Sequence, residues 1–573
     1  LTLIIENLMI KNYLRIGAIG LIAAAAMTSC SDEQQFVDYN AQAKKVDVQV
    51  LNSELAKVRD YVPLYAVIAH RGSTYWTPEE TEASWRWARD MGADYLESDL
   101  QATKDGVVLS LHDDNLKRTT NIQSVFSDQV PDIRRAFYRS LTYEDGTPCN
   151  FTEADINEQY NNDLGNYYSY YPRNYYYAEL LMLDAGSWFN EDNLEQARAS
   201  FASTNNPLQE TLDAWKADKN AQVVYTNGQY ISALADQIAY AEGKKLNRDA
   251  QGRRILPYHV KNSLKGKSLV EICSTAPSTE VEGTTWTAQA RYMDFLVYDF
   301  SNAYVADDKD SGNRPGIYIE FKESWAQPKD MEARVYKELD KWGWNIITKP
   351  ESNTQFYKNG KVNVGNTNGK VILQSFSFDA TNRAFQVFKG RVPFCYLLWT
   401  DYPGDYATDI KYDTPTGVAA FIKTMQDHGC HIIGPAISGA PNNYPEMNCP
   451  WQAYMVRRAG MINHPYSFDS QAQITKHMGY WNYGWETEFD DLMKVTIKKT
   501  PYSVFPGDSQ TWPIYMDGCF TNHTEMNLQY MIDNGMRCNS QLPNPFHPGQ
   551  NFDNSQAPST VPNSVELLNN LGY

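Results

Sequence analysis

The stretch YAVIAHRGSTYWTPEETEASW, residues 65–85, begins as an apolar run and changes character abruptly at His70, Arg71 and Gly72. The apolar run has the length and composition of a buried strand. Glycine at position 72 lets the backbone turn sharply behind the imidazole and the guanidinium. Pro78 then stands near the start of a helical pattern, where proline is favoured. The stretch therefore predicts a strand, a turn that presents two polar side chains, and a helix.

The same alternation of an apolar run and a helical pattern recurs along the rest of the chain. Counting the first run, the predicted strands begin near residues 64, 94, 316, 370, 393, 431, 460 and 513. Eight strand–helix units predict an α/β protein with a (β/α)8 TIM barrel. A doubly wound open sheet is the alternative, but no glycine-rich phosphate loop follows the first strand. In a barrel the chemistry lies at the carboxyl ends of the strands, which is where His70 and Arg71 fall.

The first 45 residues have the pattern of an export signal followed by a polar linker. Lys11 and Arg15 give a basic start, and IGAIGLIAAAA (16–26) is too short to be a comfortable transmembrane span. The small residues of MTSC then place Cys30 as in a bacterial lipoprotein cleavage site. We therefore expect a lipidated Cys30 and an exported, membrane-anchored bacterial lipoprotein on the periplasmic or cell-surface side. An ordinary signal peptide with an incidental cysteine is the alternative.

Two interruptions divide the predicted barrel. A large insertion at 121–315 separates the second and third strands, and a smaller one precedes the eighth strand. The predicted domains are a lipoprotein signal peptide (1–29), a tether with an N-terminal helix (30–62), the barrel with its insertion (63–535) and a polar C-terminal tail (536–573). The insertion contains the tyrosine-rich segment 167–179, which predicts either a surface packed against the barrel rim or an aromatic lid over the barrel mouth. The packing interpretation is favoured.

Composition and charge narrow the possible functions. With 51 Lys and Arg against 69 Asp and Glu, the net charge is −18, so the protein repels nucleic acid and we expect no such partner. A site for phosphate must therefore create its own positive potential from a metal or from a few placed basic residues. The 8 cysteines include no C-x-x-C pair, which argues against zinc, and their pairing cannot be assigned from spacing.

Paired carboxylates appear at the second predicted strand. In YLESDL, Glu97 and Asp99 are two residues apart, so both side chains point to one face of a strand. Adjacent carboxylates repel each other and both ionise readily only when a cation lies between them. Oxygen ligands favour Mg²⁺ or Ca²⁺ over zinc. The motif E-x-D is also common on surface strands, so this pair alone is weak evidence for a metal.

Further titratable residues follow at the ends of neighbouring strands. Asp105 and Gly106 predict a hairpin turn, after which the apolar run of LSLHDD ends at His112. In YIEFKE, Glu320 and Lys322 share one face at the end of the third strand. Each has an ordinary structural explanation, as a strand-end histidine or a solvated ion pair. Together with the groups on the first two strands, they supply the cation site, basic groups, acid and base that phosphodiester cleavage needs.

The segment HRG…PEET…GADYLESDLQATKDGVVLSLHDDNLKRTTN (70–121) resembles the opening signature of the glycerophosphodiester phosphodiesterase family almost throughout. Four later segments resemble further blocks of that family: 181–189, 319–322, 460–468 and 517–523. Segment 460–468 resembles the periplasmic branch of the family. The resemblance covers about residues 65–525. It implies a TIM barrel that hydrolyses small-molecule glycerophosphodiesters to glycerol 3-phosphate and an alcohol with the help of one divalent cation, Ca²⁺ or Mg²⁺.

The resemblance also implies roles for the individual side chains. These are acid–base catalysis by His70 and His112, cation binding by Glu97, Asp99 and Glu320, and phosphate binding by Arg71 and Lys322. The strand-end argument selects the same seven residues. Two positions depart from the family pattern: Glu80 replaces asparagine in Pro-Glu-Asn-Thr and adds a carboxylate near the mouth, and Asn522 replaces aspartate after Thr521. We expect both to affect which head group is accepted.

Two other classes of function fit the same residues. Sphingomyelinase D-like phospholipases are barrel enzymes that use two histidines and a cation to form cyclic phosphates, so a cyclic product would indicate that class. A non-catalytic surface protein that binds phosphodiester-bearing polymers is the second alternative. The presence of both His70 and His112 argues against it, because binding alone requires neither.

Overall fold

The computed structural model describes residues 38–573 except 127, 131–132, 187, 190–228, 251, 400–410, 479–491, 497–510, 538–570 and 572–573. The chain separates into two units, Leu1–Lys45 and Val46–Tyr573. Helix α2 (Tyr39–Lys45) is the described part of the first. The predicted signal peptide, Cys30 and most of the C-terminal tail lie outside the described residues. Among the described helices, none is both long and apolar enough to cross a membrane.

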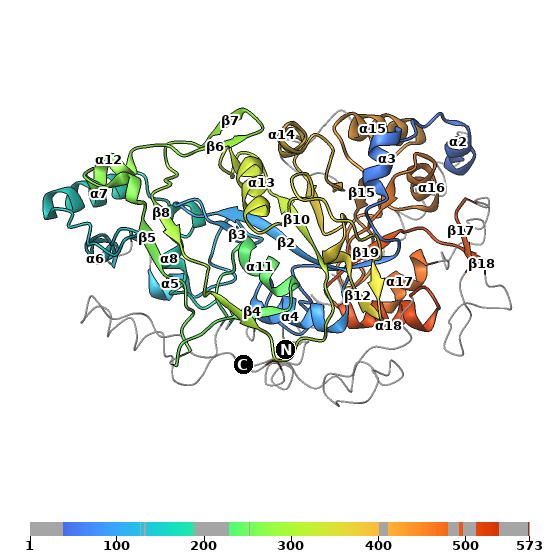
Figure 1. The fold of residues 1–573 in the computed structure, drawn as a ribbon. Helices are drawn as coiled ribbons and strands as arrows, with labels where there is room; N and C mark the ends of the chain where they lie inside the picture. Colours follow the sequence, from blue (N-terminus) through green and yellow to red (C-terminus); the bar gives the residue numbers. More distant parts are fainter. Residues whose placement is uncertain are drawn as a thin grey trace, which may run out of the picture. The chain divides into compact units, whose positions relative to one another are not determined.

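Eight parallel strands form a nearly closed barrel in the second unit, which confirms the predicted (β/α)8 fold (Figure 1). They are β1 (Ala66–Ala69), β2 (Tyr95–Ala102), β10 (Gly316–Phe321), β13 (Val371–Ser375), β14 (Phe394–Leu398), β15 (Ile432–Pro435), β16 (Ile462–Asn463) and β19 (Gly518–Thr521). Neighbours in the sheet follow chain order, and β19 pairs with β1. Backbone hydrogen bonds across the remaining seam include Asp517 N–H to Asn463 O at 2.8 Å and Phe468 N–H to Phe520 O at 2.8 Å. The carboxyl ends of all eight strands therefore surround one mouth.

These strands could be predicted from the sequence as largely apolar runs, because both of their faces are buried. Helices follow most of them: α4 (Glu82–Met91), α13 (Met331–Lys341), α14 (Phe378–Phe388), α15 (Pro415–Asp427), α16 (Pro450–Arg458), α17 (Gln471–His477) and α18 (Thr524–Asp533). Local signals place their ends, since Ser377 and Thr414 accept backbone hydrogen bonds at the starts of α14 and α15. Gly92 ends α4 in the left-handed region at φ 101°.

The predicted hairpin after β2 is present, and it leads into the large insertion. Strand β3 (Val108–Ser110) pairs antiparallel with β2. The insertion then contributes short elements: α5 (Ile122–Val125), α6 (Ile133–Ser140), α7 (Glu153–Gly165), α8 (Tyr177–Leu180), α11 (Leu234–Ala241), β4 (Lys244–Leu246), β5 (Tyr258–Val260), α12 (Leu269–Cys273), β6 (Ser278–Val281), β7 (Thr284–Thr287), β8 (Leu296–Tyr298) and β9 (Tyr304–Ala306). Outside the insertion lie α3 (Ser53–Arg59), the hairpin β11 (Tyr357–Lys358) with β12 (Lys361–Val362), and β17 (Lys494–Thr496) with β18 (Thr511–Pro513).

Buried ion pairs fasten the insertion to the barrel. Asp307, which follows β9, accepts hydrogen bonds from Arg86 at 2.6 Å and Arg89 at 2.5 Å, both on α4. Helix α11 packs against α4, β2, β3 and β10. These contacts hold the insertion beside the strands whose ends carry the predicted site.

The tyrosine-rich segment mostly forms core. Tyr175, Tyr176 and Tyr177 are 0% exposed and belong to one apolar cluster in the insertion. The ring of Tyr176 stacks on Phe137 at 5.1 Å. Tyr168 differs, because 65% of it is exposed. The buried rings favour the packing interpretation of this segment over the lid.

Candidate active site

A left-handed turn at the end of β1 presents the first two polar residues. Arg71 and Gly72 have φ angles of 51° and 84°. A Cβ atom on Gly72 would lie 2.3 Å from Ser84 Oγ, so glycine is needed for packing as well as for its backbone angle. The turn aims the Arg71 backbone N–H at Glu97 Oε2, at 2.7 Å. The predicted turn after the apolar run therefore places a backbone N–H against a carboxylate of β2.

Three carboxylates lie together on the paired segments of β2 and β10. Glu97, Asp99 and Glu320 are buried, and each offers one oxygen within 4.8 Å of the others. Strand register explains the meeting, because Glu320 is paired directly with Asp99. Gln374, on the next strand, donates from Nε2 to Glu97 Oε1 at 2.8 Å. Oxygen atoms of this kind are the ligands that a hard cation takes.

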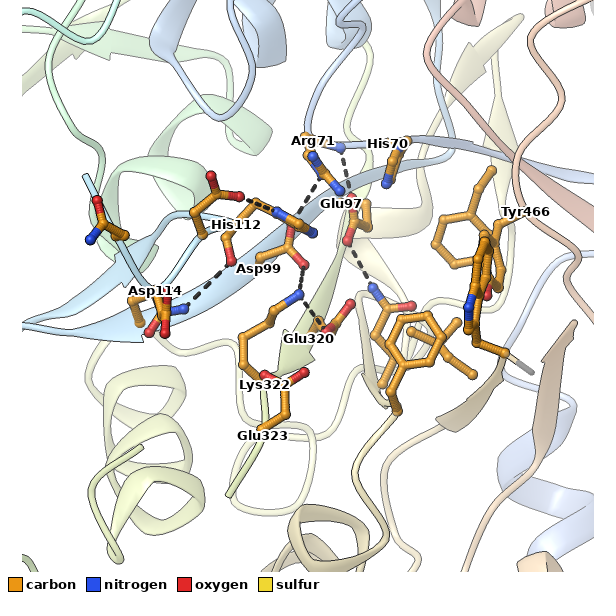
Figure 2. A pocket seen from close by; sticks show the side chains of 18 of the residues that line it. His70, Arg71, Glu97, Asp99, His112, Asp114, Glu320, Lys322, Glu323 and Tyr466 are labelled. Carbon is orange, nitrogen blue, oxygen red and sulfur yellow. Dashed lines mark hydrogen bonds and ion pairs between the residues drawn. The ribbon is translucent and has the colours of Figure 1, made fainter. Parts of the chain in front are cut away.

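Two basic side chains approach Asp99 from opposite sides, as Figure 2 shows. Lys322 Nζ lies 3.1 Å from Asp99 Oδ1 and 2.8 Å from Glu320 Oε1, while Arg71 Nε lies 3.3 Å from Asp99 Oδ2. Burial alone would raise the pKa of Asp99, but Lys322, His112 and Arg71 outweigh it and hold that pKa well below its ordinary value. This carboxylate therefore stays ionised.

The other two carboxyl groups are less stable as anions. Burial, reinforced by the charge of Asp99, raises the pKa of Glu97 well above its usual range. Burial raises the pKa of Glu320 to about 8, although Lys322 opposes the shift. Two carboxyl groups thus carry raised pKa values beside a third that is charged. A divalent cation would relieve this repulsion, and the donor set fits one.

The two histidines have different partners. His70 Nδ1 is 2.8 Å from the amide oxygen of Asn522, whereas His112 Nδ1 is 2.7 Å from the carboxylate of Asp113. Burial, and then the charge of Arg71, lowers the pKa of His70 to about 4. The pKa of His112 is also lowered, by burial and by the charges of Arg71 and Lys322. Among the described residues, neither Nε2 atom has a hydrogen-bond partner.

A pocket of about 620 Å³ connects all seven predicted residues. Asp114, Glu323 and Trp325 line it beside Lys322 and His112, and Trp325 is 64% exposed. An aromatic wall lines another part, where Trp399 and Tyr444 rings are 4.8 Å apart. Figure 2 shows Tyr466 across the pocket from Asp114 and Glu323, with the titratable groups between. The pocket therefore has an acidic part and an aromatic part joined at the carboxylates.

Several contacting residues were missed by sequence reasoning. Asp113 follows His112 directly and Gln374 stands at a strand end, so both positions carried a readable signal. Asp469, which bonds to Asn522, carried none. Glu80 was expected near the mouth, but it is only 4% exposed and is not among the residues that line the pocket. It accepts the Asp99 backbone N–H at 2.7 Å, and burial together with Asp99 raises its pKa well above the usual range.

Comparison with known proteins agrees with this geometry. Residues 70–294 match the model of the "Glycerophosphoryl diester phosphodiesterase family". A Bacillus subtilis protein named "Glycerophosphodiester phosphodiesterase" is 28% identical over 218 residues, which are 37% of this chain and 56% of the relative. A protein of the same name from Caldanaerobacter subterraneus subsp. tengcongensis is 45% identical over 62 residues, 11% of this chain and 26% of the relative. The chain thus spans little more than half the length of the Bacillus protein.

Solved structures were also compared. A phosphodiesterase of Oleispira antarctica, solved with the product sn-glycerol-3-phosphate, aligns over 82% of this chain and 97% of its own, with 13% identity and a TM-score of 0.35. A glycerophosphoryl diester phosphodiesterase structure from Silicibacter pomeroyi aligns over 83% and 97%, with 12% identity and a TM-score of 0.39. The family model matches the part of the chain that carries five of the seven predicted residues, from His70 to His112, and the chain resembles glycerophosphoryl diester phosphodiesterases over residues 70–294.

Proposed function

We propose that the protein hydrolyses glycerophosphodiesters to glycerol 3-phosphate and an alcohol, using one divalent cation and two histidines. One observation carries the proposal: the ends of β1, β10 and the β2–β3 hairpin bring all seven predicted side chains to a single pocket. The family match over 70–294 supports the same reaction. A protein that only binds phosphodiesters has no need of two imidazoles with open Nε2 atoms.

Glu97, Asp99 and Glu320 would hold the cation. Asp99 Oδ2 is buried and, apart from its ion pair with Arg71, has no hydrogen-bond partner among the described residues. When bound, Ca²⁺ or Mg²⁺ supplies Lewis-acid stabilisation of the charge that gathers on the phosphate oxygens. Oxygen ligands suit both ions. Gln374 and the Arg71 backbone N–H keep the two oxygens of Glu97 in place.

Arg71 and Lys322 bind the phosphate in this proposal. Both line the pocket, and both already lie beside carboxylates whose charge a cation would share. Arg71 Nε is buried and makes no hydrogen bond among the described residues, although it lies 3.3 Å from Asp99 Oδ2 in an ion pair. Their positive charges lower the cost of the additional negative charge at phosphorus in the transition state.

The partners of the two histidines suggest different tasks. Burial and nearby cations lower the pKa of His112, but the carboxylate of Asp113 at 2.7 Å opposes that shift, so His112 is the better suited of the two imidazoles to protonate the leaving alkoxide. His70, backed by an amide oxygen, is suited to remain neutral. Its Nε2 accepts a proton from the nucleophile, which is either water or the glycerol 2-hydroxyl group. Arg118 bonds to Asp113 at 2.7 Å and to Glu79 at 3.1 Å, which orients the carboxylate behind His112.

Location is a separate part of the proposal. The apolar segment 16–26 and the small residues before Cys30 support export and lipid attachment at that cysteine. Attachment would place the pocket on the periplasmic or cell-surface side of a membrane.

A direct assay tests the reaction. Purified protein is incubated with glycerophosphocholine or glycerophosphoethanolamine in Ca²⁺, Mg²⁺ or EDTA, and products are followed by phosphorus NMR. Release of glycerol 3-phosphate with a cation, and its loss in EDTA, is the expected result. Accumulation of a cyclic phosphate would instead favour a phospholipase D-like reaction. The absence of turnover under every condition would favour a protein that only binds phosphodiesters.

A further inference from the structure

We infer that Asn522 and Asp469 form a positioning pair that fixes the tautomer of His70, with its hydrogen on Nδ1 and its Nε2 open to the substrate. Neither residue is among the seven that the strand ends indicate. The inference rests on the proposed hydrolysis for its functional meaning, but the tautomer itself is a property of the free protein.

The contacts form a chain across the seam that closes the barrel. His70 follows β1, Asn522 follows β19, and Asp469 lies between β16 and α17. Asn522 donates from its backbone N–H to Asp469 Oδ1 at 2.7 Å and from Nδ2 to Asp469 Oδ2 at 3.2 Å. Its other amide atom, Oδ1, is 2.8 Å from His70 Nδ1. Residues that follow three separate strands thus meet in one hydrogen-bonded line.

The chemistry of the carboxylate sets the direction of this line. A carboxylate only accepts hydrogen bonds, so the NH₂ group of Asn522 must face Asp469. The carbonyl oxygen of Asn522 then faces His70, and it also accepts from Thr74 Oγ1 at 2.8 Å. Because that oxygen cannot donate, His70 Nδ1 must carry the hydrogen. Nε2 is left with its lone pair, as a proton acceptor requires.

Asp469 is itself held from several sides. Its Oδ2 accepts from Ser467 Oγ at 2.6 Å and from Asn442 Nδ2 at 2.7 Å. With the two bonds from Asn522, these contacts leave the carboxylate little freedom to rotate. The orientation of the amide is therefore determined before any substrate arrives.

The amide of Asn522 also separates the carboxylate of Asp469 from the imidazole of His70. The charged groups that face His70 are Arg71, Asp99 and Asp469, and the amide of Asn522 is its direct partner. Burial, and then Arg71, lowers the pKa of His70 to about 4, against the raising effects of Asp99, Asn522 and Asp469. His112 differs because its Nδ1 meets the carboxylate of Asp113 directly. The arrangement thus separates a neutral imidazole from one suited to carry a proton.

Exchanging the two side chains tests the inference. The double variant Asn522→Asp with Asp469→Asn keeps the number of charges and amides but brings the carboxylate against His70. Long-range ¹H–¹⁵N spectra of ¹⁵N-histidine-labelled protein, assigned with His70→Gln, report the tautomer and pKa of His70 without any turnover. We expect the Nδ1–H form in the wild type and a rise of one to two pKa units in the exchange variant, the effect of a charge-assisted hydrogen bond.

Asp469→Asn alone is expected to let the amide of Asn522 reverse. Nδ2 of Asn522 then faces His70, and the hydrogen of the imidazole moves to its Nε2. We expect kcat/KM at neutral pH to fall about tenfold, because one hydrogen bond shifts an equilibrium by about that factor. Asn443→Asp adds a charge at an exposed neighbouring position and serves as the matched control, with no expected change in the spectrum of His70.

Two outcomes would overturn the inference. One is an Nε2–H tautomer of His70 in the wild type, and the other is an unchanged pKa of His70 in an exchange variant whose thermal unfolding matches the wild type. A wild-type protein without turnover would reject the proposed hydrolysis, while the tautomer measurement would still decide the role of Asn522 and Asp469.

Discussion

Replacing Gly72 by alanine tests whether the turn after β1 is as constrained as the structure indicates. The new Cβ would lie 2.3 Å from Ser84 Oγ, 2.5 Å from Ser84 Cβ and 2.9 Å from the Ser84 backbone carbon. Ser84 is fully buried in α4 and cannot move away without shifting that helix. Alanine must also adopt a φ of 84°, which is unfavourable for any residue with a Cβ.

These two costs can be separated. The left-handed backbone costs about 1–2 kcal/mol, and inserting a methyl group into packed structure costs about 1–3 kcal/mol. We therefore expect Gly72→Ala to lower the free energy of unfolding by about 2–5 kcal/mol. Gly146→Ala is the matched control, because Gly146 has a φ of 80° but its Cβ would meet no atom within 4 Å. It should lose only the backbone component.

Urea unfolding followed by tryptophan fluorescence measures both variants, and calorimetric titration with Ca²⁺ or Mg²⁺ measures the site. Displacing the turn removes the Arg71 N–H from Glu97, so cation affinity should fall in Gly72→Ala and stay unchanged in Gly146→Ala. Equal destabilisation of the two variants would show that Ser84 accommodates the methyl group. The packing argument for Gly72 would then be wrong.

Four further predictions concern the chemistry. His70→Ala and His112→Ala should each lower kcat by about 10²-fold or more with folding intact, and near-normal turnover in either would reject the acid–base assignment. Cation binding should release protons near pH 7, because the pKa of Glu320 is raised to about 8 and a ligand carboxyl group must be ionised. A pH indicator measures the released protons. The cation affinity should weaken as the pH falls below the pKa of Glu320. Gln374→Leu should weaken cation binding about 10- to 100-fold by releasing one oxygen of Glu97, measured by calorimetry, and unchanged affinity would count against a supporting role. Cys30→Ser should abolish incorporation of labelled palmitate in cells, whereas continued labelling would place the lipid elsewhere.

Much of the barrel could be read from local pattern. The strands of the barrel are buried on both faces, so most of them appear as short, largely apolar runs whatever they pair with; β2, which carries Glu97 and Asp99, is the less apolar exception. Turn residues such as Gly106 marked the β2–β3 hairpin for the same local reason. The carboxyl ends of the strands surround one mouth in any such barrel, so the sequence predicted that the seven side chains lie close together.

Glu80 illustrates where local pattern failed. Its place in the family-like segment Pro-Glu-Glu-Thr predicted a carboxylate near the mouth, yet Glu80 is buried beside the Asp99 backbone, with a φ of 55°. Whether a polar side chain at a turn is buried depends on residues brought in from elsewhere. In this case the backbone N–H of Asp99, 19 positions away, donates a hydrogen bond to the buried Glu80 carboxyl group.

The amino-acid sequence by itself determined the strand–helix alternation, the sharp turn behind His70 and the kinds of chemical group at the strand ends, because each depends on neighbours within a few residues. Only the tertiary structure decided which group stands against which. The partner of His70 is 452 positions away and that of Glu97 is 277 positions away. Periodicity carries no information about such pairs, since they arise only when the barrel closes and burial favours a hydrogen-bond partner for most polar groups.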